Sequence, residues 1–447
     1  MKNTICLLVD RLHIGYWGAY GNSEIETPTL DCLAAESFLA DRFYIDTTDP
    51  VRQCRSWWCG VHAIAQNAPP TIMAQLNAAG YRTVLVTDDP EIAYSHNAGD
   101  FSDVQLLPTS LNAEPCDEID ATHLCEMLAT VAATAESLAS SGTPYCLWCH
   151  LRGFDEIWDF PLFLREKYCG EDDPEPYQSV IPPFTLSGDC TANKTPLRSV
   201  TGSLTSYHSQ DDIRQAVVSA YMGGVTMFDE LLEMLIEPLR NGELGDETLF
   251  LLAGTRGVLF GEHDVIGIPP TNADWTEPLA SPLVQVPLVI RFPDGFGATV
   301  RSDALLQPPD VTRLLYKWLE LSVPGELLNT SCAGPNMLDT IREETQNLRE
   351  HILIVASPDS TVPRCLVTPT WYLQEIDPAE NTDDRFALYV KPDDRWDVNN
   401  VADRCAEVVE QLAEVMRGRG ATMNMSSTGE NIGRRERNEA MWLDHSD

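Results

Sequence analysis

Residues Thr4–Val9 read Thr-Ile-Cys-Leu-Leu-Val and are followed at once by Asp10-Arg11. A short, almost continuous apolar run of this kind is typical of a β-strand that is covered on both faces. Four further runs share this character, and segments with helical periodicity separate them. These runs are Arg82–Thr87, Tyr145–His150, Thr248–Ala253 and Val286–Phe292. The alternation predicts an α/β sandwich with a largely parallel sheet, whose functional residues follow the carboxyl ends of the strands.

The segments between the runs carry helix signals of their own. Thr27-Pro28 offers an N-cap followed by a proline in the first turn, and residues 71–79 run into Gly80, a typical helix stop. Residues 120–140 and 212–240 predict two longer helices, because their apolar residues recur at helical spacing.

The pattern changes after about residue 325, which predicts two domains. We expect residues 1–325 to form the α/β domain, with residues 170–211, rich in Pro, Ser, Thr, Asp and Gly, running over its surface. Short strands followed by a helix at 401–416 predict a smaller α+β domain over residues 326–416. The polar remainder, residues 417–447, predicts a disordered tail.

The charge of the chain argues against several classes of partner. Thirty Lys and Arg residues face 68 Asp and Glu residues, which gives a formal net charge of −38. Such a surface repels phosphate backbones and anionic lipids, so we expect no nucleic-acid or membrane partner. The N-terminal apolar run stops at Asp10 and no cleavage site follows it. We therefore expect a cytoplasmic protein.

One cysteine pattern has alternative interpretations. Cys146-Leu-Trp-Cys149-His150 has the spacing of a c-type haem attachment site, and these residue types also bind zinc. The motif lies inside a run expected to be a strand. We therefore interpret its residues as buried strand residues, with haem or zinc as the alternatives.

Framework motifs along the chain resemble those of the sulfatase family, within the alkaline-phosphatase superfamily. They follow the family's order from the first strand to about residue 415. The motifs are Cys6–Asp10, Gly18–Asn22, Thr27–Glu36, Ala79–Thr83, Asp229 with Gly245–Thr248, Gly261–His263, Val286–Ile290 and Leu388–Asn400. The resemblance implies an alkaline-phosphatase-like α/β/α sandwich with a smaller C-terminal α+β domain. It also implies hydrolysis of sulfate esters by a formylglycine beside a divalent cation, usually calcium.

Other residues stand where the family places its nucleophile and its proton donors. The resemblance puts Pro50 at the nucleophile position and Arg52 at the proline of the nucleophile motif, while a shifted register offers Cys54 as a plain thiol. The remaining positions hold Asp88 and Pro90 (in Thr87-Asp88-Asp89-Pro90), Phe154 and Ile268. None of these supplies the Lys or His donors of the family, so the resemblance predicts that the catalytic groups are lost.

The metal-ligand positions have changed as well. Asp10 persists from the family's first Asp pair, but its neighbour is Arg11, and the second pair is replaced by Thr255-Arg256. Two guanidinium groups beside one carboxylate disfavour a bound cation. We therefore expect neither calcium nor formylglycine. Arg11 and Arg256 are expected either to pair with Asp10 or to bind a small anionic or sulfated ligand.

Three functions follow from these observations. The combined changes favour a catalytically inactive pseudo-sulfatase with a binding, scaffolding or regulatory role. The alternative is an active sulfuric ester hydrolase, or a related phosphoryl- or sulfuryl-transfer hydrolase, that uses non-standard residues. A purely structural or interaction protein is the third, and its mark would be an exposed aromatic patch at Trp57-Trp58 or Trp158–Phe160. We interpret these aromatic residues mainly as core residues, because adjacent Trp residues can bury one ring and shield the other. We expect His263, in the retained Gly-Glu-His motif, to be structural.

Overall fold

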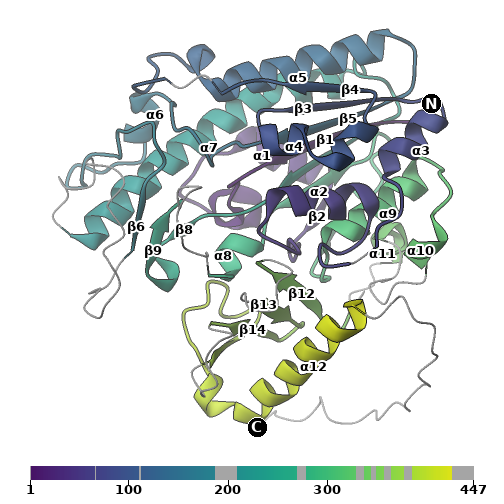
Figure 1. The fold of residues 1–447 in the computed structure, drawn as a ribbon. Helices are drawn as coiled ribbons and strands as arrows, with labels where there is room; N and C mark the ends of the chain where they lie inside the picture. Colours follow the sequence, from purple (N-terminus) through teal and green to yellow (C-terminus); the bar gives the residue numbers. More distant parts are fainter. Residues whose placement is uncertain are drawn as a thin grey trace.

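A computed structural model describes residues 2–65, 67–109, 112–186, 209–268, 278–328, 337–343, 349–356, 364–376 and 385–424. Its centre is an eight-stranded sheet (Figure 1). In spatial order the strands are β11 (Arg301–Ser302), β2 (Phe38–Ala40), β10 (Leu288–Arg291), β7 (Thr248–Gly254), β1 (Asn3–Val9), β5 (Tyr145–Leu151), β3 (Arg82–Thr87) and β4 (Asp103–Leu106). Every neighbouring pair is parallel except the two that involve β10. The largely parallel α/β sheet expected from the sequence is confirmed.

Successive side chains of each strand point to opposite faces of the sheet, and in the buried strands both sets are apolar. Helices therefore cover both faces. Ile5, Leu7 and Val9 of β1 pack on one side, and Cys6 and Leu8 pack on the other. The first side is covered by α1 (Pro28–Ala35), α5 (His123–Ser140) and α7 (Gln210–Arg240), and the second by α2 (Pro50–Cys59), α3 (Ile72–Ala78) and α9 (Pro308–Trp318). Shorter helices are α4 (Pro90–Ala93), α6 (Leu162–Glu166), α8 (Ser281–Val284), α10 (Gly325–Leu328) and α11 (Met337–Glu343).

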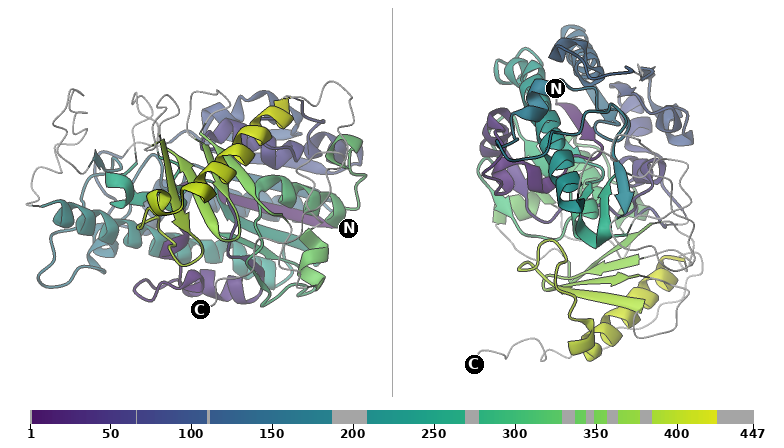
Figure 2. Two further views of the ribbon diagram at one scale, coloured as in Figure 1. Left: turned by 90° about the horizontal axis from the view of Figure 1, so that it is seen from below. Right: turned by 90° about the vertical axis from the view of Figure 1, so that its left-hand side faces the viewer.

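Two smaller sheets complete the described fold. A four-stranded antiparallel sheet near the C-terminus contains β12 (Ile352–Val355), β13 (Arg364–Val367), β14 (Trp371–Glu375) and β15 (Phe386–Val390). Helix α12 (Ala406–Asn424) packs across it, as both views in Figure 2 show. A three-stranded sheet is formed by β6 (Phe184–Leu186), β9 (Val265–Gly267) and β8 (Leu259–Phe260).

Several boundaries differ from the sequence expectation. Helix α12 continues to Asn424, so residues 417–424 are helical and not part of a tail; Gly418 and Gly420 each weaken a helix by only about 1 kcal/mol, which does not end it. Residues 425–447 and residues 187–208 of the expected surface excursion lie outside the described residues. The run Val286–Phe292 forms the antiparallel strand β10, because an apolar run indicates burial but not strand direction.

The aromatic residues expected as a possible exposed patch are buried. Trp57 and Trp58 on α2 are 0% exposed and stack edge-on against Trp148 of β5. Trp158 and Phe160 are buried in the opposite layer. The interpretation of these residues as core is confirmed, and they form no exposed aromatic patch. Within the described segments, no helix is both long and apolar enough to cross a membrane.

Candidate functional site

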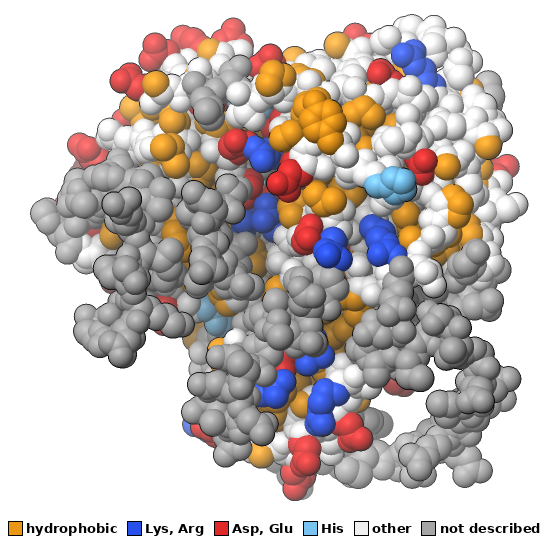
Figure 3. Space-filling view, in the orientation of Figure 1, with side chains coloured by type: hydrophobic (Ala, Val, Ile, Leu, Met, Phe, Trp, Pro, Cys, Tyr) orange, Lys and Arg blue, Asp and Glu red, His pale blue; other side chains and the backbone are white. Residues whose placement is uncertain are grey.

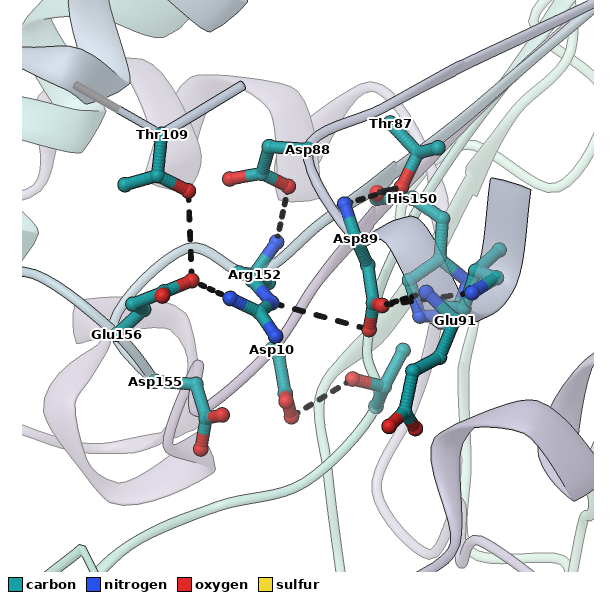
Figure 4. Close-up of polar contacts among 12 residues, drawn as sticks. Asp10, Thr87, Asp88, Asp89, Glu91, Thr109, His150, Arg152, Asp155 and Glu156 are labelled. Atoms are coloured by element: carbon teal, nitrogen blue, oxygen red, sulfur yellow. Dashed lines mark hydrogen bonds and ion pairs between the residues drawn. The ribbon is translucent and has the colours of Figure 1, made fainter. Parts of the chain in front are cut away.

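Four neighbouring parallel strands end in polar residues at the same edge of the central sheet. Asp10 follows β1, Thr255 follows β7, Arg152 follows β5 and Asp88 follows β3. Because these strands lie side by side in the order β7-β1-β5-β3, their carboxyl ends bring the four residues together. Figure 4 shows Asp10, Asp88, Asp89, Arg152 and Asp155 gathered at this edge.

The carboxylate of Asp10 is fully engaged by its neighbours. Its Oδ1 accepts hydrogen bonds from the Arg11 backbone N–H (3.0 Å), the Thr255 hydroxyl (2.9 Å) and Nε of Arg256 (3.0 Å). Nη2 of Arg256 donates to Oδ2, so the guanidinium holds both carboxylate oxygens in a bidentate pair. Asp10 is only 4% exposed, and both of its carboxylate oxygens accept hydrogen bonds from the protein.

A second acid joins this pair to Arg11. Oδ1 of Asp155 accepts from Nε of Arg11 at 2.8 Å and lies 3.2 Å from Nη2 of Arg256. Arg11 is 1% exposed, has a left-handed backbone (φ 60°) and also donates to the carbonyl oxygen of Gly257 at 3.2 Å. Two guanidiniums and two carboxylates thus alternate in one closed group. We call Asp10, Arg11, Asp155, Thr255 and Arg256 the Asp10 network.

The ionisation of Asp10 depends on these contacts. Burial disfavours the charged form, but the Arg256 guanidinium, with smaller contributions from Arg11 and the Thr255 hydroxyl, outweighs it and lowers the pKa of Asp10 below its ordinary value. Asp10 is therefore a carboxylate at neutral pH whose charge is balanced by protein groups.

Arg152, which sequence reasoning did not single out, organises the acids beside the Asp10 network. Its backbone N–H donates to Oδ1 of Asp88 at 2.8 Å, and its guanidinium pairs with Glu156 and lies 3.9 Å from Asp89 (Figure 4). The other oxygen of Asp88 contacts Nε2 of His123 at 3.0 Å. Asp88 therefore serves as an anchor between strand ends.

The residues at the expected nucleophile position form the start of α2. Pro50 occupies the first turn, where Asp49 caps the helix by accepting from the Arg52 N–H at 3.1 Å. The buried Gln53 donates to the carbonyl oxygens of Thr47 (2.6 Å) and Thr255 (2.8 Å), which ties this helix to the end of β7. Pro50 has no heteroatom in its side chain and supplies no nucleophile.

Cys54, the residue offered by the shifted register, has a histidine nearby. Its Sγ lies 3.9 Å from Nδ1 of His150 on β5, and both side chains are buried. Burial raises the pKa of the Cys54 thiol well above its usual value, and nearby acids, first Asp89, add to this. Burial also lowers the pKa of His150. A neutral thiol beside a neutral imidazole is a weak nucleophile.

The remaining residues of the expected site take part in packing or in helix capping. Phe154 is 0% exposed and packs on Tyr221 at a ring-centroid distance of 5.2 Å. Ile268 is buried, and its N–H donates to the carbonyl oxygen of Pro183. Pro90 opens α4, where Asp89 caps by accepting from Glu91 and Ile92. His263 packs against Tyr389, with Nε2 3.8 Å from Asp397.

The Asp10 network does not suit a calcium ion. Calcium takes about six to eight oxygen ligands, and here the Asp10 oxygens already accept from Arg256 and Thr255. The guanidiniums of Arg11 and Arg256 would repel a cation placed between them. Among the described residues, no group of three or more His, Cys, Asp or Glu side chains is arranged to hold a metal ion. The residues present therefore do not fit the family's metal.

The architecture and this edge of the sheet define a class of protein, the alkaline-phosphatase-like hydrolase fold. Phosphonate monoester hydrolase of Agrobacterium radiobacter superposes with a TM-score of 0.70 at 16% identity over 98% of this chain and 100% of that one. The Silicibacter pomeroyi phosphonate monoester hydrolase gives 0.70 at 17% identity over 96% of each chain. A protein solved with its substrate D-glucosamine-2-N,6-O-disulfate gives 0.68 at 15% identity, over 95% and 99%.

The family model named Sulfatase matches residues 2–321, and the chain belongs to the sulfatase family. No curated protein matches the sequence significantly. The family resemblance stated from the motifs is thus confirmed, as are the fold and the small antiparallel C-terminal sheet.

Proposed function

We propose that this protein is a catalytically inactive member of the sulfatase family that retains the fold for a binding, scaffolding or regulatory role. The observation that carries the proposal is the bidentate pair between Arg256 and Asp10. A guanidinium there supplies a fixed positive charge at the place where the family's resemblance implies a divalent cation, so the sheet edge is neutralised without a metal.

The surroundings of that pair support the same conclusion. Sulfuryl transfer needs a nucleophile and groups that stabilise charge developing in the transition state. The Pro50 position has no nucleophilic atom, Phe154 is apolar and buried, and Asp88 is an acid held by His123 and Arg152. Each replacement removes a different requirement of the reaction.

The alternative, hydrolysis by non-standard residues, would depend on Cys54 and His150. Their burial and the raised pKa of the thiol oppose it, because attack requires a thiolate that reaches substrate. We therefore place activity through this pair second.

The direct test measures turnover of an aryl sulfate and of a phosphonate monoester by the full chain. We expect rates equal to those of two matched variants, Asp10→Asn and Cys54→Ser, at equal protein concentration. Turnover that exceeds background and disappears in Asp10→Asn would overturn the proposal. Turnover that disappears only in Cys54→Ser would instead establish the thiol mechanism.

A second test concerns the metal. After dialysis against calcium and magnesium, elemental analysis of the natural chain should find no stoichiometric divalent ion. The double variant Arg11→Asp/Arg256→Asn restores oxygen donors and removes both guanidiniums, so it should retain more calcium than the natural chain. About one ion per natural chain would contradict the idea that arginine replaces the metal.

A further inference from the structure

A separate cavity lies between the central sheet and the small C-terminal sheet. Its volume is about 470 Å³, and its walls come from the ends of β2 and β15 and from the β13–β14 turn. β2 is three strands away from β1, or about 14 Å at normal strand spacing, so the cavity is distinct from the Asp10 network. It rests on observations independent of the proposed function.

The cavity wall is rich in cations although the chain is strongly acidic. Arg42, Arg301, Lys391 and Arg395 line it together with the acids Asp41 and Asp303. In Figure 3, acidic side chains crowd the upper left outline of one face, while Lys and Arg occupy only a few places. Four cations around one cavity are therefore unusual for a chain with a formal net charge of −38.

Two of these cations are already neutralised. Nε of Arg301 donates to both oxygens of Asp41 at 2.8 Å, and Lys391 donates to Oδ1 of Asp397 at 2.6 Å. Asp397 in turn accepts from the backbone and hydroxyl of Ser281. The positive charges of Arg301 and Lys391 are therefore each balanced by a carboxylate of the protein.

The other two have no carboxylate partner among the described residues. Arg42, 8% exposed, donates to the backbone carbonyls of Thr368 (2.7 Å) and Pro369 (3.0 Å), and Arg395 donates to the carbonyl of Tyr20 at 2.9 Å. These bonds hold the guanidiniums in place without a direct ion pair to a described carboxylate. Burial lowers the pKa of Arg395, and the charge of Asp41 in the same wall offsets this effect only in part.

We propose that this cavity, which we call the Arg42–Arg395 pocket, binds a small organic molecule that carries an oxyanion group. Guanidinium groups match carboxylate, sulfate and phosphate oxygens through paired hydrogen bonds. The cavity is much larger than an inorganic ion needs, and its walls include the side chains of Tyr44, Leu305 and Pro392. These apolar surfaces accommodate an organic body, and the volume is that of an ordinary small-molecule site.

The position of the pocket gives such a ligand a structural consequence. Arg42 follows β2 of the central sheet, whereas Arg395 follows β15 of the C-terminal sheet. A ligand that contacts both guanidiniums bridges the two sheets and stabilises their contact by binding only the assembled fold.

The test is isothermal titration of the full chain with phenyl phosphate, phenyl sulfate and benzoate, with benzyl alcohol as the neutral control. At least one anion should bind with a Kd below about 1 mM, and benzyl alcohol should not. The three anions distinguish phosphate, sulfate and carboxylate chemistry. Failure of all three to bind would overturn the proposal.

Variants then locate the binding. Arg42→Gln and Arg395→Gln should each weaken it about tenfold or more, whereas Arg52→Gln, an exposed arginine paired with Asp49 on α2, should not change it. Asp303→Asn removes an exposed acid from the wall and should tighten binding even if both arginine variants fold poorly. Affinity that is unchanged in both Arg395→Gln and Asp303→Asn would place the anion elsewhere and contradict the proposal.

Discussion

The Asp10 network and the Arg42–Arg395 pocket lie along the same edge of the central sheet, but they differ in how the charges of their guanidinium groups are balanced. In the network, each guanidinium is paired with a carboxylate, and Asp10, Arg11 and Thr255 are buried. In the pocket, two guanidiniums donate to backbone carbonyls, form no ion pair with a described carboxylate and face a cavity. A closed charge network contributes to folding, whereas uncompensated charge beside a cavity is what a ligand site requires. This comparison moves the expected anion site away from Arg11 and Arg256.

The largest expected effect comes from breaking the network. Arg256→Ala leaves Asp10 buried beside only its hydrogen-bond donors, and should lower the free energy of unfolding by about 3 kcal/mol. Urea denaturation monitored by far-UV circular dichroism measures this. Arg52→Ala, which removes an exposed pair, is the control and should cost about 0.5 kcal/mol or less. Equal stability of the two variants would show that the Arg256–Asp10 pair contributes no more to the free energy of unfolding than an exposed pair does.

The next effect is a pH dependence from His13, which lies between the two regions. His13 packs against Trp396, next to Arg395, and burial, followed by the charge of Arg395, lowers its pKa to about 3. The unfolded chain binds this proton below its ordinary pKa of 6.5, so stability falls as pH drops below 6.5. At pH 5 the loss is about 2 kcal/mol.

His13→Asn tests that source of pH dependence. Asn keeps an acceptor for the Gly15 N–H, which Nδ1 of His13 now caps, but does not titrate. The variant should lose less stability between pH 7 and pH 5 than the natural chain, by denaturant titration at each pH. A parallel loss in both proteins would assign the acid sensitivity to other groups.

A smaller effect is expected from Thr255. Thr255→Val removes the hydroxyl that donates to Asp10 while keeping the shape of the side chain, and should cost about 1–2 kcal/mol. Thr255→Ser retains the donor and should recover most of this difference in the same denaturation assay. If the Val variant is as stable as the natural chain, the hydroxyl of Thr255 contributes nothing to stability.

The smallest effect is expected in the pocket. Arg395→Ala removes one carbonyl contact and an unbalanced cation, so the free energy of unfolding should change by about 0.5 kcal/mol or less. Its melting temperature should nevertheless lose any rise that a bound anion gives the natural chain. A loss of stability as large as that of Arg256→Ala would make Arg395 a structural group and remove the contrast between the two regions.

Much of the central sheet could be predicted because local sequence controls it. The expected strand Arg82–Thr87 is observed with the same bounds, and the first strand differs by one residue at its start. Strand β14 and helix α2 were not predicted, because neither stands out as a continuous buried run or a strongly periodic segment. The family resemblance placed Asp10 and Arg256 together at metal-ligand positions, with pairing or an anion site as the two expectations, and in the structure the two side chains pair.

Other features depended on the tertiary structure. Asp155 and Arg152 lie just after β5, but their partners come from β1, β3 and β7, so only the order of the strands shows that they belong to the site. A charged residue directly after a buried parallel strand was the available signal. Arg42 and Arg395 are 353 positions apart, and no local pattern relates them.

The sequence by itself determined the family and the largely parallel sheet, because these follow from local motifs and strand patterns. The tertiary structure decided which charges are satisfied. Arg11 and Arg256 form ion pairs with acids, whereas Arg42 and Arg395 donate to carbonyl oxygens and form no ion pair with a described carboxylate. Both outcomes depend on side chains brought together from distant segments. Burial strengthens electrostatic interactions there, so the presence or absence of a counter-charge has a large effect on the free energy.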